Sequence, residues 1–174
     1  VYGLTKGVKA VATGYTHTCA LTNKGKVWCW GDNSYGQLGD NTTTSSPKPV
    51  AVYGLTSKVK SISAGDYTTC VLTTKRTVKC WGYGVNGELG NNATSSSSRP
   101  VGVYKLKHVT ALTNGGYHAC ALVSGGKPFC WGYNGVGELG NNTATSSPKP
   151  VAVYGLSSGV KQISGGTYHT CAVI

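Results

Sequence analysis

The sequence contains no methionine, a single phenylalanine and only five acidic residues among its 174 positions. It has no run of roughly 18 or more apolar residues, so no segment is predicted to span a membrane. With few carboxylates, no nucleophile elbow and no phosphate-binding loop, it offers little material for catalysis. We therefore expect a protein that is not an enzyme and that binds no cofactor or metal.

Glycine, by contrast, occupies 26 positions, and serine and threonine are frequent. This composition is typical of many short strands joined by tight turns. The 16 lysines and arginines give a net charge of +11, which favours acidic partners. The basic residues are scattered along the chain, however, and only two are arginine, the better phosphate ligand. We therefore expect a solvated basic surface and no nucleic-acid partner.

The segment Cys-Trp-Gly occurs three times, and each copy follows another cysteine ten positions earlier. The first cysteines of the repeats are Cys19, Cys70, Cys120 and Cys171, at spacings of 51, 50 and 51 residues. A period near 50 fits one four-stranded blade of a β-propeller. The predicted fold is all-β, with antiparallel blades that each span one repeat.

We expect complete blades at residues 1–53, 54–104 and 105–154, and a partial blade at residues 155–174. Three blades and part of a fourth cannot close a ring of four to eight. The chain is therefore either a piece of a longer repeat protein or a unit whose copies complete one another, as a closed dimer or head to tail. No signal peptide is visible, as expected of a mature or excised segment.

Each blade is predicted to hold four strands, which in the first repeat are residues 8–12, 17–22, 26–30 and 49–53. A long polar loop over residues 31–47 joins the last two. Asn23 to Gly25 forms a hairpin loop with Gly25 in the left-handed position.

The hairpin count places the two cysteines of each complete blade directly opposite each other, within disulfide range. The predicted pairs are Cys19–Cys29, Cys70–Cys80 and Cys120–Cys130. Zinc is the competing interpretation, but the spacing lacks a zinc knuckle. Cys171 is left unpaired or available to another chain. Disulfides of this kind predict an oxidising location, outside the cell or at its surface.

The long loops carry glycosylation sequons at Asn41, Asn92 and Asn141. Three histidines recur two positions before the first cysteine, namely His17, His118 and His169. A ring of histidines around an axis could hold a metal or an anion. Thr68 interrupts the series, which favours a structural hydrogen bond to neighbouring backbone instead. His108 lies outside the series and is given no role.

Glu88 and Glu138 are repeat equivalents of Gln37, and a position that accepts glutamine is poor evidence for acid–base chemistry. The remaining acids, Asp32, Asp40 and Asp66, have no carboxylate partners at matching positions. Among the aromatic residues, the three tryptophans of the Cys-Trp-Gly segments fit packing between blades. The candidate binding residues are those in or near the loops or at a variable strand position: Trp28, Tyr35, Tyr83 and Tyr133.

The pattern Gly-x-x-His-Thr-Cys-Ala-Leu, then Gly-x-Val-x-Cys-Trp-Gly, then Gly-Gln-Leu-Gly resembles the regulator of chromosome condensation repeat family. The resemblance implies a β-propeller, usually of seven blades. A nuclear member is a guanine-nucleotide exchange factor that binds chromatin, but no segment here departs from the repeat to supply an exchange wedge. The cysteine pair is similar to a secreted bacterial branch, and secreted propellers that inhibit β-lactamases bind their targets through loops.

We therefore expect a non-catalytic extracellular or cell-surface scaffold that binds proteins or glycans, or assembles with copies of itself into a structural module such as a filament. The alternative is a secreted inhibitor or ligand-binding propeller that acts on a specific soluble protein through its loops.

Overall fold

The computed structural model describes residues 3–55 and 58–174. These residues form an all-β array without helix, as the composition predicted. Residues 1–2 and 56–57, which the predicted first and second blades include, lie outside the described residues. The precise ends of the blades stay a prediction.

In the part of the chain that the structure describes, three antiparallel sheets have four strands each, and a fourth sheet has two. The first sheet holds β1 (Val8–Thr13), β2 (His17–Thr22), β3 (Val27–Gly31) and β4 (Ser46–Ala51). The second holds β5 (Val59–Ala64), β6 (Thr68–Thr73), β7 (Val78–Gly82) and β8 (Ser97–Gly102). The third holds β9 (Val109–Asn114), β10 (His118–Val123), β11 (Lys127–Gly132) and β12 (Ser147–Ala152), and the last β13 (Gln162–Gly165) and β14 (Thr170–Val173).

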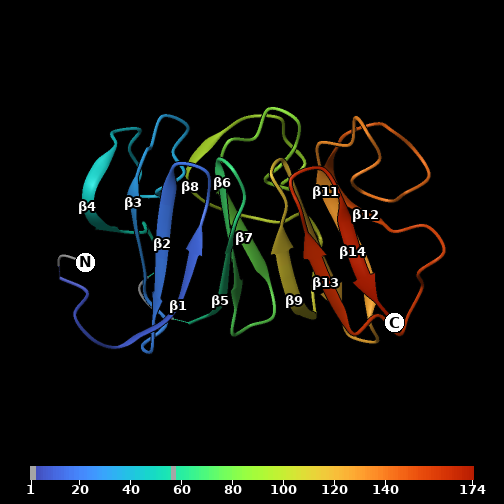
Figure 1. Ribbon diagram of the computed structural model, residues 1–174, viewed down its shortest axis with the longest axis horizontal. Coiled ribbons are helices and arrows are strands. Elements are labelled where there is room, and N and C mark those ends of the chain that lie inside the picture. Colours follow the sequence, from blue (N-terminus) through green and yellow to red (C-terminus); the bar gives the residue numbers. More distant parts are fainter. Residues whose placement is uncertain (1–2, 56–57) are drawn as a thin grey trace.

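The strands of each sheet pair in chain order, as in propeller blades. The first strands β1, β5, β9 and β13 contact one another in succession, so they form the inner row of the array. Figure 1 shows the sheets side by side, without closure into a ring. The predicted all-β propeller architecture is therefore confirmed.

Two ends of this array are distinguished below. The upper end carries the turns between the first and second strands and the long connections between the third and fourth (Figure 1). The lower end carries the hairpin turns between the second and third strands and the linkers between sheets. Both ends recur in every blade because the chain direction is the same in each.

The cysteine hairpin forms as its spacing predicted. Cys19 lies opposite Cys29 in the β2–β3 register, and Gly25 in the turn has a φ of 72°. The three disulfides are Cys19–Cys29, Cys70–Cys80 and Cys120–Cys130, each with a Cα–Cα distance of 4.1 Å. All six cysteines are buried, so each disulfide lies inside the packed part of its blade.

The fourth strand differs from its prediction. β4 begins at Ser46 and ends at Ala51, whereas residues 49–53 were expected. Pro47 and Pro49 lie within it, because an outer strand has one side that makes no ladder hydrogen bonds. The proline positions therefore mark an edge strand and not its start.

Tryptophan fills the space between neighbouring sheets. Trp81 of the second sheet is fully buried in a cluster with Leu38 and Leu21 of the first. Trp131 occupies the equivalent place between the second and third sheets, beside Leu89. Trp30, which has no described sheet before it, is half-buried. The predicted packing of these tryptophans between blades is thus present at two interfaces.

Three positions at the lower end of each repeat have left-handed backbone, and most of them are glycine. An L-residue in this conformation costs roughly 1–2 kcal/mol. The non-glycine residues at these positions are Lys58 (φ 74°), Arg76 (φ 61°), Lys105 (φ 51°) and His108 (φ 58°). In other repeats their places are taken by Gly3, Gly7, Gly25, Gly54, Gly126, Gly155 and Gly159.

Removing one disulfide tests its contribution to stability. We expect the double variant Cys70→Ala/Cys80→Ala to lower the free energy of unfolding by about 3 kcal/mol, because the unfolded chain regains the entropy of a short closed loop. Chemical denaturation under non-reducing conditions measures the change. Cys171→Ala is the control, since Cys171 forms no disulfide among the described residues. An equal shift in both variants would contradict this contribution.

Candidate binding surfaces

Six tyrosines form a continuous track across the upper end of the four sheets. Tyr35 makes edge contacts with Tyr67 and Tyr83, at centroid distances of 5.3 and 5.1 Å. Tyr117 contacts both Tyr67 and Tyr83, at 6.1 and 6.3 Å. The track is completed at its ends by Tyr15 against Tyr67 and by Tyr168 against Tyr117. We call these six residues the tyrosine track.

The structure brings together only some of the candidate residues. Tyr35 and Tyr83 belong to the track, and Tyr133 lies beside it in a cavity of about 230 Å³ with Tyr117 and Tyr168. Trp28 lies apart, in β3, where it lines a separate cavity with Leu4 and Pro49. The four residues therefore do not form one surface.

Sequence reasoning missed four members of the track, namely Tyr15, Tyr67, Tyr117 and Tyr168. They lie in the turns between the first and second strands, just before the recurring His or Thr position. Their recurrence was visible in the aligned repeats, but nothing in the sequence placed these turns against the long loops.

Partial burial raises the pKa of the hydroxyls of Tyr67 and Tyr117, and the nearby Asp66 raises both further. These phenols therefore remain protonated at neutral pH and can donate hydrogen bonds. Burial also raises the pKa of Asp66 itself. The track combines flat apolar rings with polar groups, the composition that recurs at protein-binding surfaces.

The recurring histidines do not face a common axis. His17 Nε2 lies 2.8 Å from Thr69 Oγ1 of the next blade, and Thr69 donates its proton to the Gln37 carbonyl at 3.0 Å. His17 Nε2 must therefore carry the hydrogen, which leaves Nδ1 buried without a partner. His118 repeats the arrangement with Thr170. The expected structural hydrogen bond exists, but its acceptor is a side chain of the neighbouring blade.

Burial lowers the pKa of His17 to about 4, against a smaller opposing effect of Asp32. A proton on Nδ1 would place a charged donor in a buried site without an acceptor, which is costly. Burial lowers the pKa of His118 as well. Both rings are therefore neutral at ordinary pH and serve as fixed hydrogen-bond donors.

The Gln37, Glu88 and Glu138 side chains cap the turn that precedes them. Each accepts the backbone N–H two residues earlier, at 2.9, 2.8 and 3.1 Å respectively. Burial raises the pKa of Glu88. This capping role explains why glutamine and glutamate alternate at one position.

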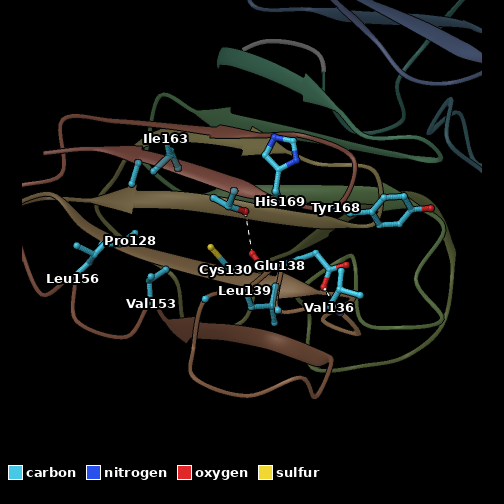
Figure 2. A pocket seen from close by; sticks show the side chains of 14 residues that line it. Pro128, Cys130, Val136, Glu138, Leu139, Val153, Leu156, Ile163, Tyr168 and His169 are labelled. Atoms are coloured by element: carbon cyan, nitrogen blue, oxygen red, sulfur yellow. Dashed lines mark hydrogen bonds between the residues drawn. The ribbon is translucent and has the colours of Figure 1, made fainter.

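An apolar pocket of about 250 Å³ lies between the third sheet and the partial fourth. Figure 2 shows Leu139, Val153 and Ile163 around it, with Tyr168 at the rim. The equivalent spaces at the two earlier interfaces hold Trp81 and Trp131. No tryptophan belongs to the buried cluster of described residues around this pocket.

The backbone carbonyl that accepts a hydrogen bond from each interface tryptophan also recurs from repeat to repeat. Trp81 Nε1 donates to the Gln37 carbonyl at 2.9 Å, and Trp131 Nε1 to the Glu88 carbonyl at 3.0 Å. Glu138 and Thr170 both line the pocket, and the Glu138 carbonyl accepts a hydrogen bond from Thr170 at 3.0 Å, drawn as the dashed line in Figure 2. A carbonyl oxygen has two lone pairs, so this one can accept a second donor, as Gln37 does.

A glycine of the preceding blade lies directly against the ring of each buried tryptophan. A Cβ on Gly39 would lie 2.5 Å from the Trp81 ring, and one on Gly90 would lie 2.7 Å from the Trp131 ring. A Cβ on Gly140 would meet only Val153, at 3.2 Å. Cys171, in β14 beside this pocket, is exposed and has no disulfide partner among the described residues.

The sequons occupy the long loops. Asn41 and Asn92 are exposed, whereas Asn141 is half-buried and its side-chain oxygen accepts bonds from Asn134 and Thr143. The third sequon lies one residue earlier than the other two, because the left-handed asparagine of that repeat is Asn142. Glycosylation at the three sites stays a prediction, with the first two the more accessible.

A metal-binding cluster and a membrane-spanning helix are both absent from the described residues. No three His, Cys, Asp or Glu side chains gather there in an arrangement that could hold a metal ion. No helix in residues 3–55 and 58–174 has the length and hydrophobicity needed to cross a bilayer.

The sequence matches two models described as the regulator of chromosome condensation (RCC1) repeat. One matches residues 8–37, 59–88 and 107–138, and the other residues 24–72 and 126–173. The E3 ubiquitin-protein ligase HERC2 of Homo sapiens is 37% identical over 106 residues, which are 59% of this chain and 2% of the ligase. The ultraviolet-B receptor UVR8 of Arabidopsis thaliana is 37% identical over 84 residues, 48% of this chain and 19% of the receptor.

Solved structures give the same result for the fold. Human WBSCR16 superposes with a TM-score of 0.83 at 25% identity, over 95% of this chain and 44% of that chain. Prp20p of Saccharomyces cerevisiae gives 0.84 at 20% identity, over 98% and 44%. This chain therefore spans less than half the length of each of these four proteins.

The buried histidine predicts a pH dependence of stability. Between pH 6.5 and pH 4 the unfolded chain binds a proton at His17 that the folded chain does not, so stability falls as the pH is lowered. We expect wild type to lose up to about 3 kcal/mol more than His17→Thr between pH 7 and pH 4. Urea unfolding at both pH values measures this.

Threonine is the residue found at the equivalent position of the second blade, Thr68. His169→Thr is the control, because the same residue is exposed in the partial blade. A pH dependence that is identical in wild type and His17→Thr would show that burial does not perturb this histidine.

Proposed function

The chain belongs to the regulator of chromosome condensation repeat family, and from this premise we propose that it is a non-catalytic scaffold that binds a partner protein through the tyrosine track. The three buried disulfides favour a location in an oxidising compartment, outside the cell or at its surface. In this proposal the blades hold the upper connections in fixed positions, and the tyrosines of these connections contact the partner protein.

The tyrosine track is the observation that carries this proposal. Its rings are in mutual contact across four sheets, so their positions are fixed before a partner arrives. A tyrosine supplies a large contact area at a low cost in side-chain entropy. Exposure within the track varies: Tyr15 is 74% exposed, Tyr35 42% and Tyr168 56%. A preorganised and partly exposed aromatic surface is well suited to protein recognition.

The relatives support protein binding in general terms. The solved structure of Prp20p is described together with its binding to Gsp1p and histones, and another with Kap60 bound to it. Those partners are properties of that protein. A specific soluble target that this chain inhibits through its loops is the narrower version of the proposal, and it uses the same surface.

Truncating the track tests the proposal. We expect Tyr67→Ala/Tyr117→Ala to lower the affinity for the partner protein by roughly 30-fold or more, because two central aromatic contacts are lost. Tyr53→Ala/Tyr154→Ala is the control, since both residues are exposed in the linkers at the lower end. A partner captured by wild type from the native extracellular fraction is purified, and its affinity is measured by calorimetry. Equal affinity for both double variants would reject the track as the binding surface.

The pocket beside β14 favours a second candidate, completion of the fourth blade by a strand from another chain. β14 pairs only with β13 among the described strands, so its other edge is open. A strand with the sequence of β3 would bring a tryptophan to Gly140 and the Glu138 carbonyl. Its cysteine would lie opposite Cys171, as Cys130 lies opposite Cys120.

A peptide with the sequence of residues 26–31 tests this candidate. In a glutathione redox buffer, we expect its cysteine to form a mixed disulfide with Cys171 at least about tenfold more readily than that of a peptide with Trp30→Ala, because the indole docks in the pocket. Mass spectrometry measures the adduct, and Cys171→Ser is the control. Equal reaction of both peptides would mean that the pocket does not bind the indole.

A further inference from the structure

The charged residues of this protein are segregated between its two ends. All five carboxylates lie in upper connections, at Asp32, Asp40, Asp66, Glu88 and Glu138, and these connections contain no lysine or arginine. The lower connections contain no carboxylate in any described blade. The expectation of a basic surface without a dedicated face overlooked this arrangement.

Thirteen of the 16 basic residues belong to the lower end, either in its connections or in the first two positions of the strands that begin there. We call this set the basic end. It consists of Lys6, Lys9, Lys24, Lys26, Lys58, Lys60, Lys75, Arg76, Lys79, Lys105, Lys107, Lys127 and Lys161. All are exposed except Lys79 and Lys127, which are half-buried.

Some of these cations occupy places that the backbone reserves for glycine. Lys58, Arg76 and Lys105 all have positive φ, at positions where other repeats have glycine. Glycine would adopt this conformation without the steric cost that a side chain pays. Strained positions that persist in spite of their cost cluster at functional sites. Cations rather than glycines in the lower hairpin of the second sheet and in the linkers on either side of that sheet therefore point to a role that solubility alone does not explain.

Arg76 is also held in a fixed position. Its guanidinium donates to Ser124 Oγ at 2.7 Å and to the His108 carbonyl at 3.4 Å, both in the third blade. Lys9 Nζ similarly donates to the Lys60 carbonyl of the next blade, at 3.2 Å. These contacts hold positive charge across the boundaries between blades, which gives a continuous surface.

We propose that the basic end is a binding surface for an acidic polysaccharide. Thirteen cations without an intervening side-chain carboxylate create a field that attracts a polyanion over about a Debye length, roughly 10 Å at moderate salt. The positions repeat from blade to blade, so a linear chain of regularly spaced negative charges can contact several blades at once. The tyrosine track at the opposite end stays free for a protein.

Two observations favour a polysaccharide over a nucleic acid. Only Arg76 in this set is an arginine, although arginine is the residue suited to bidentate phosphate contacts. Lysine is a point charge that serves sulfate and carboxylate groups equally well. The disulfides are consistent with an oxidising compartment, where acidic polysaccharides rather than nucleic acids are the common polyanions.

Glycine substitution separates binding from folding. We expect the full chain to bind immobilised heparin in 0.1 M NaCl and the variant Lys58→Gly/Lys105→Gly to bind it about tenfold more weakly, because two ionic contacts are lost. The thermal midpoint of this variant should be unchanged or raised, since glycine relieves the left-handed backbone. The matched control is Lys48→Gln/Lys149→Gln, which removes the same charge from the outer strands β4 and β12.

The control should bind heparin within about twofold of wild type. Equal losses in the two variants would overturn the proposal, because binding would then follow net charge alone. Tighter binding to duplex DNA or to anionic lipid vesicles than to heparin, at the same salt concentration, would also overturn it. Full retention of binding in Tyr67→Ala/Tyr117→Ala is expected, since the tyrosine track lies at the other end.

Discussion

The hydrogen-bonded tryptophan between blades is the interaction on which the rest of the structure depends. A single blade has two faces and cannot bury both, so each sheet requires the next. Trp81 and Trp131 meet this requirement, since each ring fills the space between two sheets and donates to a carbonyl of the preceding blade. Glycine is required at positions 39 and 90, because a side chain at either position would collide with the tryptophan ring. The pocket beside β14 has the equivalent glycine, Gly140, and the equivalent acceptor, the Glu138 carbonyl.

A second set of contacts fixes the blades in the same relative position. The hydroxyls of Thr69 and Thr170 accept from a histidine and donate to a carbonyl, both in the preceding blade. Blade three has Ala119 at the position of Thr69, and there Asn114 instead donates to Thr68 at 3.1 Å. Because the inner rows are held in this way, the upper turns approach one another closely enough for their tyrosines to touch. The geometry of the tyrosine track is thus a consequence of packing between the sheets beneath it.

The two ends of the array differ because a blade has a fixed chain direction. Every upper connection begins after a first or third strand, and every lower one after a second or fourth. Equivalent residues of successive repeats therefore lie at the same end of the array. A residue type that recurs in each repeat accumulates at that end. In this way the protein presents aromatic rings and carboxylates at one end and lysines at the other, although its composition suggests only a basic protein. The two proposed partners, a protein and an acidic polysaccharide, would therefore bind at opposite ends of one scaffold.

The sequence by itself determined what depends on period and local count. The repeat of about 51 residues gave the blades. The ten-residue cysteine spacing gave the disulfides, because strand pairing around a short turn is a local matter. The bounds of β4 were predicted wrongly, because proline fits both the start of a strand and any position in an outer edge strand. Contacts between repeats were decided by tertiary structure. The track formed by Tyr67 and Tyr117, the histidine donating to Thr69, and the gathering of scattered lysines at one end all depend on how far each blade is rotated from the last. That rotation is set by side-chain packing between sheets, which no spacing along one chain encodes.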